Sequence, residues 1–405
     1  MKSIRSSRRL GAALALGTSV VLLASCSAET EAEAEGAAAQ TNPSATSRLA
    51  VSYDGGALIL DADTLDTVDD ISGIKGFTRL NPAGDGRHVF VSGTGAFTAL
   101  DVGTWTEGAE HYTSTPALTN IAFDATTPGH VVRHDGKTVL FDDGTGLVQI
   151  FESAALLGGS TPETETYTTP EAHHGVAVEL SDGSLLTTIG NEDERTGIVV
   201  LDAERNEIVR NEECPGVHGE AVAANETVVV GCQDGLLLYR GGTITKVQSP
   251  DAYGRIGNQA GDENSTILLG DYKVDPDAEL ERPTRVSLTD TVSGQLSLVD
   301  LGTSYTFRSL GRGPDGEAIV LGTDGALHVI DVDTKAVTQT IPVVGAWEEP
   351  VEWQEPRPAL FVQDGTAYVS EPATREIHAV DLSTGAVTAS AELPQTPNEL
   401  TGVTG

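Results

Sequence analysis

The sequence repeats a short pattern of strands and turns along most of its length. Asp-Gly pairs stand between short runs of β-branched residues, and they begin at Asp54, Asp85, Asp135, Asp182, Asp234, Asp324 and Asp364. Such pairs favour the tight turns of β-hairpins. A second mark, an apolar strand that ends in aspartate before a turn, returns at intervals of about 40 residues. The chain is therefore predicted to be all-β and to consist of repeated units.

Each unit contains four short apolar runs, which is typical of a blade of a β-propeller. Eight units can be counted between residues 48 and 403. The first unit, residues 48–71, has only three strands, and an extra strand near residues 398–403 ends the chain. We expect an eight-bladed β-propeller whose C-terminal strand completes the first blade and closes the ring, which leaves no exposed sheet edge. The rival fold, a pair of β-sandwiches, does not explain the regular spacing.

The N-terminal region predicts export. Basic residues precede a short apolar stretch, residues 10–23, which ends in the sequence Leu-Ala-Ser-Cys at Cys26 and resembles a bacterial lipobox. Residues 1–25 are expected to be a lipoprotein signal peptide, and lipidated Cys26 would anchor the protein to the outer face of the cell membrane. An ordinary secretory signal or an uncleaved anchor is the alternative. Residues 26–47 are expected to form a flexible tether, and residues 48–405 the propeller.

Charge and cysteine content narrow the choice of partners. The formal net charge is −36, which argues against nucleic acid or anionic lipid as a partner and raises the local concentration of cations. An acidic surface is also common in salt-tolerant exported proteins, so the charge alone does not identify a metal protein. With Cys26 lipidated, Cys214 and Cys232 remain as a pair. In an exported chain this pair predicts a disulfide, and a thiol metal site is the alternative.

Histidines recur at one phase of neighbouring units. His174 and His218 each stand before a glycine and an apolar strand that is expected to be the innermost strand of its blade. His134 is expected at the returning end of a second strand in the preceding blade, and so at the same mouth of the central channel. Clustered imidazoles are ligands for zinc. The sequence predicts a metal site shared by three blades, and a structural role for each histidine is the alternative.

Further residues are candidates for the same site. His173 is a possible fourth ligand, and Glu220 and Asp135 could bind the metal or orient the histidines. His130 shares a strand face with His134 and could contribute to the site or pack in the interior. His111, in a segment between blades, could offer a weak extra ligand.

Signals of enzymatic catalysis are poor. The sequence has no Gly-x-Ser-x-Gly elbow, no His-Glu-x-x-His, no phosphate loop and no Cys-x-x-Cys. We therefore expect a binding protein and not an enzyme. One alternative is a metal-dependent hydrolase, such as a lactonase, with Glu220 as general base. The other is an interaction scaffold that binds no metal.

The segments that carry these histidines resemble motifs of the AztD family of zinc chaperones. The similar segments are residues 134–136, 173–178 and 214–221, and the likeness extends from residue 48 to residue 403. Members are exported eight-bladed propellers that hand zinc to the solute-binding protein of an ABC importer. Some members also carry a histidine-rich loop after the second blade, where this chain has only His111.

The resemblance implies a function and a site. The protein would be a monomeric, lipid-anchored zinc chaperone whose partner is the solute-binding protein of a zinc importer. Its zinc ligands would be His134, His174 and His218, with His173 as a further candidate.

Overall fold

The computed structural model describes residues 39–405. The expected signal peptide, the lipidation site Cys26 and the expected tether up to residue 38 lie outside this range. The described residues are mainly strands and turns, with one short 3-10 helix, η1 (Ser153–Gly158), among them. The all-β prediction is confirmed. Within the described part of the chain, no helix has the length and apolar character needed to cross a membrane.

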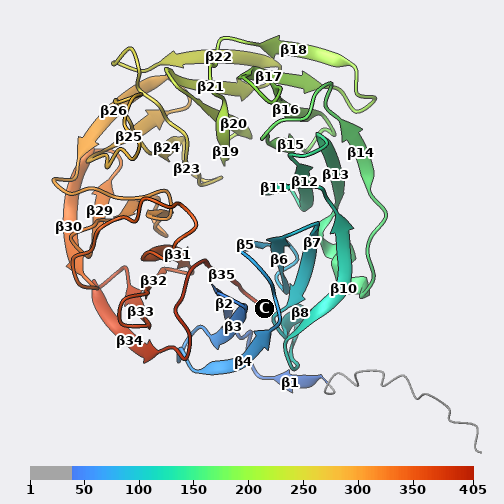
Figure 1. Ribbon diagram of the computed structural model, residues 1–405, viewed down its shortest axis with the longest axis vertical. Helices are drawn as coiled ribbons and strands as arrows, with labels where there is room; N and C mark the ends of the chain where they lie inside the picture. The colour runs from blue at the N-terminus through green and yellow to red at the C-terminus, as the bar shows by residue number, and fades with distance from the viewer. Residues whose placement is uncertain (1–38) are drawn as a thin grey trace, which may run out of the picture. The chain divides into compact units, whose positions relative to one another are not determined.

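Eight four-stranded sheets are formed by residues 39–405, and they follow one another around a ring (Figure 1). Neighbouring strands within each sheet are antiparallel, as expected for strands joined by short turns. One strand of each sheet lies near the centre of the ring and another lies at its rim (Figure 1). This arrangement is consistent with a β-propeller.

From the centre outward, the eight sheets contain the following strands: β35 (Leu400–Val403), β2 (Arg48–Tyr53), β3 (Gly56–Asp61) and β4 (Thr67–Ser72); β5 (Arg79–Pro82), β6 (His88–Gly93), β7 (Ala96–Asp101) and β10 (Ala117–Asp124); β11 (Pro128–His134), β12 (Lys137–Asp142), β13 (Leu147–Glu152) and β14 (Glu165–Thr168); β15 (Ala177–Glu179), β16 (Leu185–Gly190), β17 (Arg195–Leu201) and β18 (Glu207–Asn211); β19 (His218–Ala223), β20 (Thr227–Cys232), β21 (Gly235–Arg240) and β22 (Thr243–Gln248); β23 (Gln259–Ala260), β24 (Ile267–Gly270), β25 (Arg285–Asp290) and β26 (Gln295–Asp300); β27 (Leu310–Arg312), β28 (Ala318–Leu321), β29 (Ala326–Asp331) and β30 (Ala336–Pro342); β31 (Ala359–Gln363), β32 (Thr366–Glu371), β33 (Glu376–Asp381) and β34 (Ala386–Glu392).

The first sheet combines strands from both ends of the described chain. β35 pairs with β2, and Thr401 lies opposite Ala50. The pairing extends past the strand, because the amide of Ser52 donates to the carbonyl oxygen of Glu399 at 2.9 Å. The C-terminal strand therefore supplies the innermost strand of the first sheet.

A hairpin interrupts the second sheet. β8 (Thr104–Glu107) and β9 (Glu110–Thr113) follow β7 in the chain, but they pair with β1 (Gln40–Asn42) in a separate three-stranded sheet. β10 then returns to complete the second sheet beside β7. The next strand, β11, is consequently the innermost strand of the third sheet. His134, expected on a second strand, instead ends an innermost strand.

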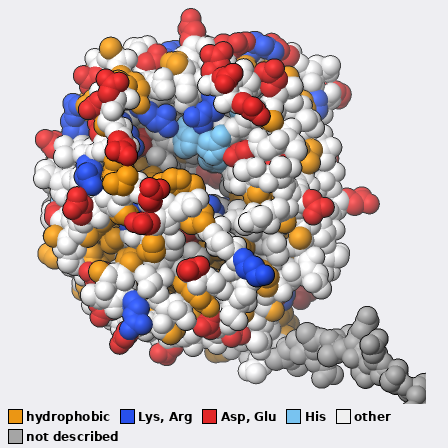
Figure 2. Space-filling view, in the orientation of Figure 1, with side chains coloured by type: hydrophobic (Ala, Val, Ile, Leu, Met, Phe, Trp, Pro, Cys, Tyr) orange, Lys and Arg blue, Asp and Glu red, His pale blue; other side chains and the backbone are white. Residues whose placement is uncertain are grey.

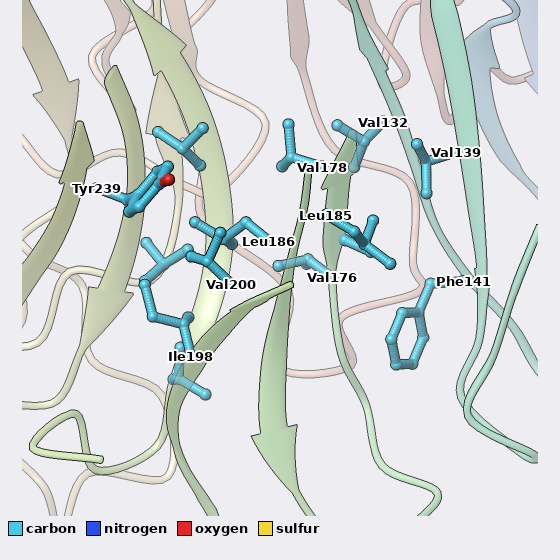
Figure 3. Close-up of a cluster of buried hydrophobic side chains, with 14 of the residues drawn as sticks. Val132, Val139, Phe141, Val176, Val178, Leu185, Leu186, Ile198, Val200 and Tyr239 are labelled. Carbon is cyan, nitrogen blue, oxygen red and sulfur yellow. The ribbon is translucent and has the colours of Figure 1, made fainter. Parts of the chain in front are cut away.

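Apolar side chains fill the space between neighbouring sheets. Figure 3 labels Val132 of the third sheet and Val176 beside the fourth. Together with Val228 of the fifth sheet, they belong to a cluster of buried residues that are at most 6% exposed. Burying a side chain of this size contributes roughly 1.5–3 kcal/mol. The cluster therefore holds the third, fourth and fifth sheets in fixed positions relative to one another.

Deletion of residues 398–405 should destabilise the protein strongly. It removes every pairing of β35 and uncovers buried apolar residues such as Leu49, which is fully buried. We expect a loss of at least about 2 kcal/mol in the free energy of unfolding, measured by urea denaturation. Deletion of residues 404–405 keeps the β35 pairing and is the control. Equal stability of the two deletions would contradict a structural role for β35.

Candidate metal centre

Three histidine side chains from neighbouring sheets lie together. His130 is on β11, His174 precedes β15 and His218 begins β19. One ring nitrogen of each lies within 4.8 Å of the others, and the ring centroids are 5.1 to 5.8 Å apart. Histidine side chains are visible together near the centre of the face in Figure 2. Imidazoles at this spacing form a donor set suited to zinc.

Glycine follows two of these histidines for a steric reason. Gly219 has a φ of +71°, and a Cβ at this position would lie 2.5 Å from the carbonyl oxygen of Gly257. A Cβ on Gly175 would lie 2.5 Å from the ring of Phe141 and 2.7 Å from Nε2 of His173. The two histidine-glycine pairs therefore arise where the chain packs closely against a neighbouring loop or side chain.

The Nδ1 atom of each of the three rings faces an oxygen atom. The pairs are His174 with a carboxylate oxygen of Asp143 at 2.5 Å, His218 with the carbonyl oxygen of Gly257 at 2.6 Å, and His130 with a carboxylate oxygen of Glu220 at 3.3 Å. Metal-binding histidines commonly donate their second ring nitrogen to such an oxygen, which fixes the orientation of the ring. This pattern leaves the three Nε2 atoms for a metal.

Exposure differs among the three rings, and His218 is the most deeply buried of them. Burial of His218, together with the nearby His130, lowers the pKa of His218 well below its usual value of 6.5. His218 is therefore neutral at neutral pH, as a metal ligand must be. The side chain of His174 is 44% exposed and that of His130 is 24% exposed. Solvent can reach the group from the side of His174.

Two arginines border the histidines. The positive charge of Arg255 contributes to the lowered pKa of His218, and Arg195 interacts electrostatically with both Arg255 and Asp143. Basic side chains are visible beside the histidines in Figure 2. They bring positive charge to this part of an acidic chain, and the charge of Arg255 disfavours protonation of His218.

The structure does not bring His134 into this group. Its ring lies between the carboxylates of Glu226 and Glu263, each at 2.9 Å. Both glutamates follow the ends of innermost strands, whereas the grouped histidines lie near the beginnings of such strands. Asp135 occupies the turn after β11, with a φ of 45°, at the same end as His134. The histidine of β11 that reaches the group is His130.

Two other candidate histidines have different partners. His173 is only 3% exposed, and its ring nitrogens face the carbonyl oxygen of Glu171 at 3.0 Å and the hydroxyl of Thr188 at 2.9 Å. Both nitrogens are thus engaged within the protein. His111 lies on β9, where its Nδ1 is 2.8 Å from the hydroxyl of Thr106. Neither is part of the three-histidine group.

A disulfide lies beside His218. Cys214 and Cys232 are joined, with their Cα atoms 4.9 Å apart, as the sequence predicted. Cys232 ends β20 next to Gly231, which pairs with His218. Cys214 lies in the segment that leads into β19. The crosslink therefore anchors the segment that carries His218.

Sequence reasoning missed two residues that hold the rings. Asp143 lies in the turn after β12, where it resembles the many other turn aspartates of the chain. Gly257 contributes only its carbonyl oxygen, and a backbone acceptor leaves no signal in a sequence. The glycine after His218 was the available clue, because it marks a close approach of the chain to another segment.

Similarity to known proteins agrees with this architecture. No family model matches the chain. It is 27% identical over 301 residues to the zinc chaperone AztD of Citrobacter koseri, which covers 72% of this chain and 69% of that protein. The structure of apo AztD from C. koseri matches 89% of this chain and 98% of its own, with a TM-score of 0.77 and 24% identity. A crystal structure of C. koseri AztD covers 89% of this chain and 99% of its own, with a TM-score of 0.78 and 24% identity.

The fold and the three-histidine group together define an all-β protein with a candidate metal centre near the middle of its ring of sheets. The particular likeness is to AztD, in sequence over 72% of the chain and in structure over 89% of it. The resemblance to the AztD family that the histidine motifs indicated is confirmed.

The ion pairs of His134 should make stability depend on pH. Burial alone would lower the pKa of His134, but its hydrogen bonds to Glu226 and Glu263 raise it above 6.5. A histidine whose pKa is higher in the folded protein than in the unfolded protein stabilises the fold fully at pH values below its unfolded pKa. This stabilisation is lost as the pH rises through its folded pKa. His134→Gln should therefore cost more free energy of unfolding near about pH 6 than near about pH 9.

Urea denaturation in the presence of a chelator measures this difference without a contribution from bound metal. His111→Gln, at a histidine whose ring faces the hydroxyl of Thr106 and not a carboxylate, is the matched control. The assignment is wrong if His134→Gln destabilises the protein more at the higher pH.

Proposed function

We propose that this protein is an extracytoplasmic zinc chaperone whose cargo is bound by His130, His174 and His218. One observation carries the proposal: three imidazoles converge while each Nδ1 faces an oxygen atom. Imidazole suits zinc better than it suits magnesium or calcium. The likeness to a protein named as a zinc chaperone supports the same choice of metal.

The proposed site favours transfer over permanent retention. Three histidines fill three positions of a tetrahedral zinc ion and leave the fourth for water or an incoming ligand. The exposed edge of His174 gives a ligand from another protein a route to that position. The receiving protein can then bind zinc before all three histidines have released it. This role requires no chemical turnover, so we propose a binding protein and not an enzyme.

We further propose where the chaperone works and what receives its zinc. The eight sheets are blades of a closed eight-bladed propeller, which presents the site at one mouth of its channel. Lipidated Cys26 and a tether through residue 47 hold the propeller, as a monomer, at the outer face of the cell membrane. The receiver is the solute-binding protein of an ABC zinc importer. Support comes from the N-terminal sequence and from the likeness to AztD.

Removal of single histidines should distinguish the histidines that bind zinc from those that have a structural role. His130→Ala, His174→Ala and His218→Ala should each weaken zinc binding at least about 100-fold, since loss of a partner that only orients a ligand already costs 10- to 100-fold. Asp143→Asn should weaken binding roughly 10- to 100-fold. Competition with a chromophoric chelator measures these affinities.

His134→Ala is the matched control, because it removes a histidine of the same strand that is bound to two glutamates. We expect His134→Ala to keep the affinity of the unaltered protein. Strong loss of zinc in His134→Ala, together with retention in His130→Ala, would refute the proposed ligand set.

Zinc-loaded protein should pass its ion to a candidate solute-binding protein faster than the ion dissociates from it into solution. If transfer occurs in a complex, its rate will rise with the concentration of the receiver. If zinc is released first, the rate will be independent of the receiver. Stopped-flow fluorescence with a zinc-responsive receiver measures the rate. Lactone hydrolysis that is lost in Glu220→Gln would instead favour a metal-dependent hydrolase.

A further inference from the structure

A second group of metal-binding side chains lies in the last sheet. Glu371 ends β32, Glu376 begins β33, and His378 follows two residues later. One ligand atom of each lies within 4.8 Å of the others. None of the three belongs to the sheets that carry the three-histidine group.

The two carboxylates face each other across the sheet. Glu371 and Glu376 are direct cross-strand partners, and His378 points to the same face as Glu376 because side chains alternate along a strand. Like charges placed directly opposite each other destabilise a sheet. The nearby Arg375 pairs with Glu392 at 3.2 Å, so its charge is directed to a different carboxylate.

A buried nitrogen points toward these carboxylates without a hydrogen-bond partner. Nδ1 of His378 faces the hydroxyl of Ser390 at 2.8 Å, whereas its Nε2 is buried and has no hydrogen-bond partner among residues 39–405. The side chain is only 10% exposed, and Nε2 lies 3.8 Å from a carboxylate oxygen of Glu371. That distance is too long for a hydrogen bond. It is close to the separation of about 3.4 Å between two ligand atoms on a tetrahedral zinc ion.

The neighbouring sheet offers an internal comparison. His328 occupies the corresponding third position of β29. Its Nε2 contacts both carboxylate oxygens of Asp324, at 3.1 and 3.2 Å. A buried ring nitrogen at this position is therefore satisfied in one sheet and left without a partner in the next. Leaving such a group without a partner is costly, and a bound cation would remove the cost.

We propose that Glu371, Glu376 and His378 form a second binding site for a divalent ion of the zinc class. One imidazole and two carboxylates give a donor set of one nitrogen and two oxygens. The imidazole favours zinc or a neighbouring transition metal over magnesium and calcium. A bound ion would neutralise the opposed carboxylates and occupy the free Nε2. The site goes beyond the proposed chaperone function, because it requires neither the three histidines nor a receiving protein.

The two groups lie at the same end of their sheets. In the fifth sheet, Gly231 near the end of β20 lies opposite His218 at the start of the innermost strand. In the last sheet, Ser370 near the end of β32 lies opposite Ala359 at the start of β31. The turn after β32 therefore occupies the end of its sheet that corresponds to the location of His218. The second ion would be held at this end.

The test counts zinc ions in a protein that lacks the first site. The background is the triple variant His130→Ala, His174→Ala and His218→Ala, and the probe is zinc alone in equilibrium dialysis. We expect the background to bind one ion, and added Glu376→Gln to weaken that binding at least about 100-fold. Glu392→Gln is the matched control, because Glu392 lies opposite Glu376 on β34 but outside the group. It should leave the binding unchanged.

Cobalt in place of zinc identifies the ligands of the retained ion. A tetrahedral cobalt spectrum in the background that disappears with Glu376→Gln would support the site. Absence of a bound ion in the background, or equal binding with and without Glu376→Gln, would overturn it. If the background still binds two ions, the proposed chaperone site is wrong. Loss of one of those two with Glu376→Gln would still support the second site.

Discussion

Packing between the third, fourth and fifth sheets holds the candidate metal centre together. Its three histidines are far apart in the sequence, and each comes from a different sheet. Among the described strands, no backbone pairing joins these sheets to one another. Their relative positions depend on the apolar cluster that runs from Val132 through Val176 to Val228. Because such an interior is close-packed, a small change in the spacing of the sheets would move the imidazoles apart.

Hydrogen bonds then fix the orientation of the imidazole rings, and so determine which ring nitrogen each histidine offers to a metal. Packing alone would leave each ring free to rotate, and a rotated ring offers its metal the wrong nitrogen. Asp143 and the carbonyl oxygen of Gly257 hold two of the rings at 2.5 and 2.6 Å. The same contacts offset part of the cost of burying polar rings. The group is thus organised by the protein itself, so a metal ion need not assemble it.

The sequence predicted the fold class and two members of the group, but for the third it favoured His134, which lies at the other end of the strand that carries His130. Repeating turns indicated an all-β chain, and the spacing of His174 and His218 indicated a shared position. The hairpin of β8 and β9 interrupts the regular succession of strands, so the sequence pattern predicts β11 as a second strand, although it is the innermost strand of its sheet. His130 and His134 lie four residues apart on this strand, about 13 Å. That distance separates one end of the sheet from the other.

Charge distinguishes the two groups that we propose as metal sites. In the first, the proposed ligands are imidazoles, which carry no negative charge, and Arg255 acts on His218. The carboxylates of Asp143 and Glu220 face the rings of His174 and His130 from behind, so they would offset the charge of a zinc ion less than carboxylate ligands would. In the second, Glu371 and Glu376 would neutralise the ion. A site that leaves its ion positive attracts an anionic ligand from outside, such as a carboxylate of another protein, to the open fourth position. If the first group holds zinc as we propose, the arginines would favour release in two ways, by weakening retention of the ion and by attracting an acidic ligand to the open position.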